Sequence, residues 1–282
     1  MKQKMKIPYT VLCYMLLIFV SAVILFPLIF LFTNSFMSVS DLNVYYGIAE
    51  KKFFHWVPDN FTLDQYVHAF LYSYQFLHSF WISILTTVPS VIFQLILSLM
   101  AGYGFAKHNF PFKNALFILY VILMMTPFQV IQAPQYILFN DIGLLDNIAS
   151  IVLTSIFYPL GICIMTQSMK KIPDELIEAS KIDGANSVQT LIHIVVPSAK
   201  NGIVTVLFLS FIEQWTIVEQ AVVFIKSTAN MPLAVMMQRL SGLSTPGSFV
   251  FALLFIIPPM LICFICDEYI LDGIIKADLL EV

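Results

Sequence analysis

Long apolar runs separated by short polar segments dominate this sequence. A helix needs about 20 predominantly apolar residues to cross the hydrocarbon core of a bilayer. Six stretches meet that requirement: residues 11–33, 77–106, 114–137, 148–169, 202–224 and 249–271. The pattern therefore predicts an all-α integral membrane protein with six transmembrane helices.

The composition supports lipid as the solvent for much of the chain. Of its 282 residues, 59% are hydrophobic and 11% are charged, whereas soluble domains carry about 25% charged residues. So much apolar surface cannot all be hidden in one water-soluble core. Three lysines precede the first apolar stretch, as in a signal peptide. That stretch is too long for a signal h-region and no A-x-A-like site follows, so we expect a retained helix.

The placement of lysine and arginine predicts the orientation. With the N-terminus in the cytoplasm, ten of the 14 basic residues fall on inside segments and four on outside segments, as the positive-inside rule expects. Six spans return the C-terminus to the cytoplasm. The predicted plan has a cytoplasmic N-terminus, a six-helix transmembrane domain, an external loop, a cytoplasmic loop and a cytoplasmic tail: residues 1–10, 11–271, about 34–76, about 170–201 and 272–282.

Several function classes are disfavoured by the polar residues. The five histidines are scattered, without an H-E-x-x-H pair or a nucleophile elbow, and no G-x-x-x-x-G-K-[ST] phosphate loop is present, so we expect no catalysis by this chain. Cys263 and Cys266 form a C-x-x-C pair inside an apolar stretch, and we interpret them as packing residues and expect no metal site. The net charge of −3 gives no reason to expect nucleic acid binding. An ion-driven secondary transporter would predict inverted repeats, of which we find no convincing case.

The cytoplasmic loop at 170–201 carries the clearest local pattern. Pro173, followed by two acidic residues, is typical of a helix start, and Gly184 is typical of a left-handed cap at a helix end. A second amphipathic stretch leads to Pro197, with four apolar residues spaced for one helix face: Val188, Leu191, Ile192 and Val195. The pattern predicts a cytoplasmic helix-turn-helix. An ordinary interfacial amphipathic loop is the alternative.

The same loop has features of a docking surface. Glu178 supplies a charge that a basic group on another protein could meet. Three small residues leave room for that protein to approach closely: Ala179, Ser180 and Ala185. We therefore expect a protein partner on this loop.

The loop resembles the EAA loop of permease subunits in ATP-binding-cassette (ABC) importers. The positions that match are Pro173, Glu178, Ala179, Asp183, Gly184, Ala185, Ile194 and Pro197. Ser180 replaces the second alanine of that motif, a small-for-small change. The resemblance implies that this is the coupling helix, seated on a separate ATP-hydrolysing subunit.

The resemblance extends across almost the whole chain, to the maltose-type second permease subunit of the carbohydrate-uptake group. Similar segments include FTLDQY at 61–66, AGYGFA at 101–106 and GLLD at 143–146. The chain departs from the group at 215–218, where W-T-I-V replaces W-N-x-F, and in its tail at 273–277. A non-sugar solute or an exported cargo therefore stays open as the alternative.

The resemblance implies the partners and the location as well. It points to a multi-pass protein of the bacterial cell membrane that forms the translocation path for a sugar or oligosaccharide. The implied partners, besides membrane lipid, are a homologous second permease subunit, two ATPase subunits or a homodimeric ATPase, and an extracytoplasmic solute-binding protein. No cofactor is expected on this chain, because ATP and Mg would bind the partner ATPase.

Polar residues within the predicted spans are candidates for the solute path, because a charge in hydrocarbon is unfavourable. Glu213 and Gln214 could bind sugar hydroxyls, and the ring of Trp215 would suit a sugar face. Alternatively, Glu213 pairs with a sister subunit and Trp215 is a packing residue. Pro127 and Pro134 free backbone carbonyls, which usually face protein or water. Candidates in the third and fourth spans are Gln129, Gln132, Gln135, Tyr136 and Tyr158.

Overall fold

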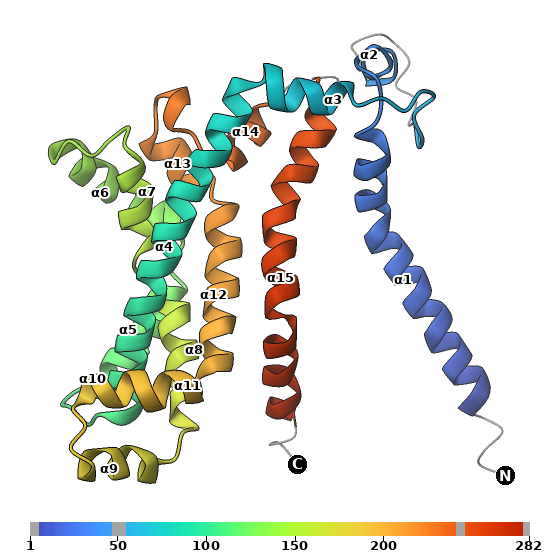
Figure 1. Ribbon diagram of the computed structural model, residues 1–282. Coiled ribbons are helices and arrows are strands. Elements are labelled where there is room, and N and C mark those ends of the chain that lie inside the picture. The colour runs from blue at the N-terminus through green and yellow to red at the C-terminus, as the bar shows by residue number, and fades with distance from the viewer. Residues whose placement is uncertain (1–5, 47–54, 241–245, 279–282) are drawn as a thin grey trace. The chain divides into compact units, whose positions relative to one another are not determined.

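The computed structural model describes residues 6–46, 55–240 and 246–278. Within these ranges the chain is helical, and its one β contact is an isolated bridge between Met37 and Phe61. The predicted all-α class is confirmed. By its internal contacts the chain divides into two units, residues 1–77 with 237–256 and residues 78–236 with 257–282, and each is described by itself (Figure 1).

Four helical segments in the described part of the chain are long and apolar enough to cross a membrane: Val11–Asn34, Tyr74–Lys107, Ile148–Lys170 (α7 and α8 together, with a short break) and Ser248–Asp267. Two bent helix pairs pass the same test, which brings the number to six if each pair is one span. Lys113–Met124 and Phe128–Asp141 meet at 94°, and Ser187–Ser198 and Lys200–Trp215 at 82°. A multi-pass membrane protein is therefore supported, and the count of six stays a prediction.

The first unit contains much of the predicted external loop at 34–76. Its helices are α1 (Lys6–Asn34), α2 (Val39–Tyr46), α3 (Asp64–Val67), a π-helical turn (His68–Tyr72) and the beginning of α15 (Ser248–Asp278). Met37, Leu42 and Phe249 form its buried centre. The buried Gln65 side chain donates hydrogen bonds to the carbonyls of Asn34 and Met37, over 2.7 and 2.9 Å. The loop is therefore packed, and residues 47–54 within it lie outside the described ranges.

The second unit holds the interrupted helices. In chain order they are most of α4 (Tyr74–Lys107), α5 (Lys113–Met124), α6 (Phe128–Asp141), α7 (Ile148–Ser155), α8 (Pro159–Lys170), α9 (Asp174–Ile182), α10 (Ser187–Thr190), a π-helical turn (Leu191–Val195), α11 (Val196–Ser198), α12 (Lys200–Trp215), α13 (Glu219–Phe224), a 3-10 turn (Thr228–Asn230) and the beginning of α14 (Leu233–Arg239). In Figure 1, α9, α10 and α11 lie at one end of α8 and α12, while α6, α7 and α13 lie toward the other.

Small residues bring α4, α8 and α12 close together. A Cβ on Gly102 of α4 would lie 2.6 Å from the Cβ of Met165 on α8, and one on Gly202 of α12 would lie 2.6 Å from the Cβ of Ser168. Helices in lipid associate through such close packing, because hydrocarbon offers no hydrophobic drive between them. The core built on this contact extends past the membrane helices into the α9–α11 loop: Tyr103, Tyr158, Met165, Met169, Ile172, Ile177, Val195, Ala199 and Val206.

Three predicted spans are not continuous helices. The predicted helix at 114–137 is wrong at 125–127, because Pro127 takes an extended conformation (φ −68°, ψ 145°) and starts α6 in a new direction. The predicted helix at 148–169 is interrupted at 156–158, before Pro159. The predicted helix at 202–224 ends at Trp215 and resumes at Glu219, and the residues between are β-branched, which weakens helix propensity.

The two predicted terminal segments are only partly described. Residues 1–5 of the N-terminus and 279–282 of the tail lie outside the described ranges. The predicted boundary at 271 is not a helix end, since α15 continues to Asp278. The orientation of both termini stays a prediction.

Candidate functional site

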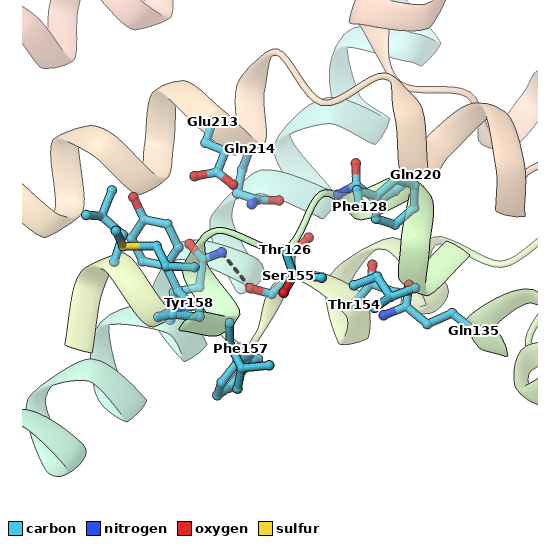
Figure 2. A pocket seen from close by; sticks show the side chains of 16 residues that line it. Thr126, Phe128, Gln135, Thr154, Ser155, Phe157, Tyr158, Glu213, Gln214 and Gln220 are labelled. Atoms are coloured by element: carbon cyan, nitrogen blue, oxygen red, sulfur yellow. Dashed lines mark hydrogen bonds between the residues drawn. The ribbon is translucent and has the colours of Figure 1, made fainter. Parts of the chain in front are cut away.

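The three helix interruptions converge on one cavity of about 550 Å³ in the second unit (Figure 2). Thr126 lines it from the first interruption, Phe157 from the second and Gln214 from the end of α12, next to the third. Irregular backbone is tolerated at membrane depth where it is buried in protein or lines a polar cavity. The cavity volume lies within the range of about 300–1,000 Å³ that is common for small-molecule sites.

Gln94 of α4 shows how the chain supports one of these interruptions. In a continuous helix the Ser155 carbonyl would accept from the N–H of residue 159, but Pro159 has none. The Gln94 amide supplies that donor, with 2.6 Å between Nε2 and the Ser155 oxygen. Gln94 is 1% exposed, and its Oε1 has no hydrogen-bond partner among the described residues. Gln94 was not among the sequence candidates, although a glutamine within a long apolar span is a readable signal.

The cavity wall combines apolar side chains with neutral polar ones and one acid. Among the described residues that line it, Glu213 carries the only charge. Figure 2 shows its carboxylate and the Tyr158 hydroxyl pointing toward each other, and the two groups interact. The neutral hydrogen-bonding side chains of the wall are Gln94, Thr126, Gln135, Thr154, Ser155, Tyr158, Gln214 and Gln220. The wall can therefore exchange many hydrogen bonds and supplies no positive charge.

The sequence candidates on α6 separate into two groups. Gln135 lines the large cavity. Gln129, Gln132 and Tyr136 instead line a second cavity of about 500 Å³. There the Gln129 side chain donates to a Glu219 carboxylate oxygen over 3.0 Å. Gln129, Gln132 and Tyr136 have the i, i+3, i+7 spacing of one helix face, and Gln135 lies outside that spacing, so α6 contributes to both cavities.

Trp215 is a packing residue in this structure. Its side chain is 2% exposed, and its ring is stacked on Phe211 with centroids 5.8 Å apart. The ring of Phe80 packs edge-to-face with that of Trp215, also with 5.8 Å between centroids. The expectation that this ring offers a face to a sugar is therefore wrong. Phe157, which is 49% exposed, lines the cavity instead.

The segment between α8 and α12 contains α9 and, after a turn, a second helical stretch of α10, a π-helical turn and α11. Pro173 precedes α9 as its N-cap, and Gly184 after it has a φ of +82°, the left-handed conformation that the sequence predicted. The Ala185 N–H donates to the Ser180 carbonyl over 2.9 Å, and the Gly184 N–H to the Lys181 carbonyl over 3.1 Å. These two bonds form a Schellman cap, which closes the C-terminus of α9.

A capping box that the sequence reasoning missed begins α10. The Asn186 side chain accepts from the Gln189 N–H, and the Gln189 side chain accepts from the Asn186 N–H, each over 2.9 Å. The signal was readable, because Asn and Gln three residues apart before an apolar stretch are typical of this motif. Both ends of the turn between α9 and α10 are therefore fixed by hydrogen bonds.

The expected docking residues differ in exposure. Six are exposed on the loop: Pro173, Glu178, Ala179, Asp183, Gly184 and Pro197. Ser180 is buried and its hydroxyl lies 2.9 Å from that of Thr190, so the expectation that Ser180 faces a partner is wrong. Of the four apolar residues predicted to share one face of the second helix, Val195 is buried, whereas Val188 and Ile192 are exposed.

Lys107, at the end of α4, holds the loop. Its ammonium group lies 2.6 Å from a carboxylate oxygen of Asp174 and also donates to the Ile172 carbonyl. The Lys107 side chain is 4% exposed. The hydrogen bond and the charge of Lys107 lower the pKa of Asp174. The sequence reasoning used Lys107 only for orientation and missed this contact, which joins residues far apart in the chain.

Asp146, in the turn before α7, ties down the segment after α13. One of its carboxylate oxygens accepts from the N–H groups of Lys226 and Ser227, over 3.0 and 2.8 Å. Its carbonyl accepts from the Asn230 side chain over 2.7 Å.

Among the described residues, no group of three or more His, Cys, Asp or Glu side chains could hold a metal.

Comparison with known proteins gives a consistent picture. The family model described as binding-protein-dependent transport system inner membrane component matches residues 94–276. Protein LplC of Bacillus subtilis is 28% identical, with 80% of this chain and 73% of that protein aligned. The arabinooligosaccharides transport system permease protein AraQ of Halalkalibacterium halodurans is 28% identical, with 70% of this chain and 69% of that protein aligned. The sn-glycerol-3-phosphate transport system permease protein UgpE of Brucella melitensis is 25% identical, with 70% of this chain and 72% of that protein aligned.

A solved structure shares the fold. It belongs to a bacterial ABC transporter involved in the import of the acidic polysaccharide alginate, and it aligns with a TM-score of 0.80, covering 96% of this chain and 99% of the other. The sequences are 20% identical.

Proposed function

The chain belongs to the family of binding-protein-dependent transport system inner membrane components, and from this premise we propose that it is a permease subunit of an ATP-driven importer for a sugar or oligosaccharide. A relative named for arabinooligosaccharide transport supports the cargo class. Export is not favoured, because the matching family is defined by binding-protein-dependent transport. A separate ATPase, a second permease subunit and an extracytoplasmic binding protein complete the proposed machine.

One observation carries this proposal: a single loop joins the two helices whose far ends line the cavity. The N-terminal end of α8 reaches the cavity with Tyr158 and Pro159, and the C-terminal end of α12 reaches it with Glu213 and Gln214. Their other ends lead into the α9–α11 loop. A force on that loop would therefore be applied to two walls of the cavity at once.

The loop is suited to transmit such a force. Its residues Ile177 and Val195 are buried in the same core as Met165 and Val206 of the membrane helices. Lys107 adds a contact between α4 and the beginning of α9. Protein interiors are closely packed and transmit displacement, so movement of the loop would reach α4, α8 and α12 together.

We assign the exposed part of the loop to the ATPase interface. The residues that we propose to contact the ATPase are Pro173, Glu178, Ala179, Asp183, Gly184, Ala185 and Pro197. Closure of an ATPase pair would pull this loop and change the access of the cavity from one side of the membrane to the other. The loop would then lie in the cytoplasm together with both termini.

Glu178 gives the sharpest test of this interface. Its side chain is exposed, so Glu178→Lys should fold while placing the wrong charge against the ATPase. In proteoliposomes with the complete transporter, we expect ATP-dependent uptake to fall at least tenfold. Asp141→Lys makes the same charge change at the exposed end of α6 and should leave uptake near the wild-type rate. Equal uptake by both variants would refute the interface.

A further inference from the structure

The wall of the large cavity in the second unit contains two hydrogen-bond acceptors that no described residue pairs with a donor. The Oε1 atoms of Gln94 and Gln135 are both buried and have no hydrogen-bond partner among the described residues. Both residues line the cavity. A buried acceptor without a partner is unfavourable, so an O–H or N–H donor should meet these oxygens when the cavity is occupied.

The charge of the wall limits what can supply those donors. Glu213 is the only charged residue among the described residues that line the cavity, and it is an acid. A carboxylate or phosphate on a solute would be repelled by Glu213 and would meet no Lys, Arg or His side chain there. An anion transferred from water needs a compensating positive charge or several hydrogen-bond donors, and the described residues of this wall supply no positive charge.

The wall also offers apolar area to a solute that is not uniformly polar. The ring of Phe157 is exposed, and Phe128, Leu123 and Ile131 line the cavity beside it. Sugar rings present hydroxyl groups at their edges and C–H groups on their faces. A wall that combines amides, hydroxyls and aromatic carbon matches both parts of such a molecule.

We infer that this cavity is a solute subsite for an uncharged, hydroxyl-rich molecule, and that it excludes carboxylated or phosphorylated saccharides of the same size. The inference rests on the proposed function and narrows it to one substrate class. Gln94 and Gln135 accept hydrogen bonds from solute hydroxyls, and Glu213 accepts from a hydroxyl while repelling anions.

The test uses the assembled transporter in proteoliposomes with its own binding protein. The vesicles are offered neutral arabinan, xylan and glucan hydrolysates together with acidic pectin and alginate hydrolysates, and the solutes accumulated with ATP are identified by mass spectrometry. Accumulation of neutral oligosaccharides alone is the expected result. Accumulation of acidic oligosaccharides would overturn the inference and leave the proposed function standing. Accumulation of no saccharide would overturn both.

A matched pair of glutamine variants tests the subsite itself. Gln135→Leu removes an acceptor from the large cavity, whereas Gln167→Leu makes the same change at an exposed position of α8 that lines neither cavity. Loss of one hydrogen bond should raise the half-saturation concentration for the accumulated neutral solute about two- to tenfold, and Gln167→Leu should leave it unchanged. No effect of Gln135→Leu, or an equal effect of both, would refute the subsite.

Discussion

Gly102 offers a direct test of how closely α4 and α8 pack. A methyl group added there would lie 2.6 Å from the Cβ of Met165 and 3.1 Å from its backbone carbonyl carbon. Carbon atoms in favourable contact are about 3.5–4.0 Å apart, so the two helices would have to separate by about 1 Å. Neither neighbouring atom is the end of a flexible side chain, so rotamer changes cannot relieve the overlap.

The matched control is Gly104, two residues along the same helix, where an added Cβ would meet nothing within 4 Å. Replacing glycine by alanine in a helix stabilises it by about 1 kcal/mol, and this gain is common to both variants. The difference in stability between the two variants therefore measures the overpacking at residue 102, which typically destabilises by about 1–3 kcal/mol. We therefore expect Gly102→Ala to be about 1–3 kcal/mol less stable than Gly104→Ala.

The assay is thermal unfolding of the two purified variants in one detergent, compared with wild type. Gly102→Ala should unfold several degrees below Gly104→Ala, and Gly104→Ala should unfold at or above the wild-type temperature. An unfolding temperature of Gly102→Ala equal to or above that of Gly104→Ala would show that α4 and α8 do not approach as described.

Two further predictions concern single polar contacts. Lys107 lowers the pKa of Asp174 in the folded protein, so the pair stabilises the fold above the ordinary aspartate pKa of about 3.9, and that stabilisation is lost as the pH falls through the lowered value. The difference in unfolding temperature between wild type and Asp174→Asn should therefore shrink from pH 6 to pH 3, and a constant difference would contradict the contact. Gln94→Leu leaves the Ser155 carbonyl without a donor and should destabilise by about 1–3 kcal/mol. In the double variant with Pro159→Ala, residue 159 has an N–H again, so part of the lost stability should return. A double variant whose loss of stability equals the sum of the two single losses would refute the role of Gln94.

The sequence predicts well what depends on local pattern. Apolar length located the helical segments, because any segment of about 20 residues in lipid must satisfy its backbone internally. Gly184 was predicted to be left-handed from its place after a helical stretch, and its φ of +82° agrees. Such features need only neighbours in sequence.

Features that depend on distant neighbours were harder to predict. A hydropathy window averages across Pro127 and Pro159, so it reports apolar length and not the helix interruptions that line the cavity. The burial of Trp215 depends on Phe80, which belongs to another helix. The sequence suggested that Ser180 is a small surface residue, but its hydroxyl lies 2.9 Å from that of Thr190, ten residues further along the chain. Gln94 is visible in the sequence as a polar residue in an apolar span, but its hydrogen bond to the Ser155 carbonyl joins residues 61 positions apart.

We propose that this chain moves solute as one subunit of an ATP-driven importer. The most direct measurement is to purify the chain from its native membrane in mild detergent and to identify every protein that accompanies it. We expect a second permease subunit, an ATPase and an extracytoplasmic solute-binding protein, with ATP hydrolysis in the purified complex. Recovery of the chain alone or as a homodimer, without an ATPase, would contradict the account.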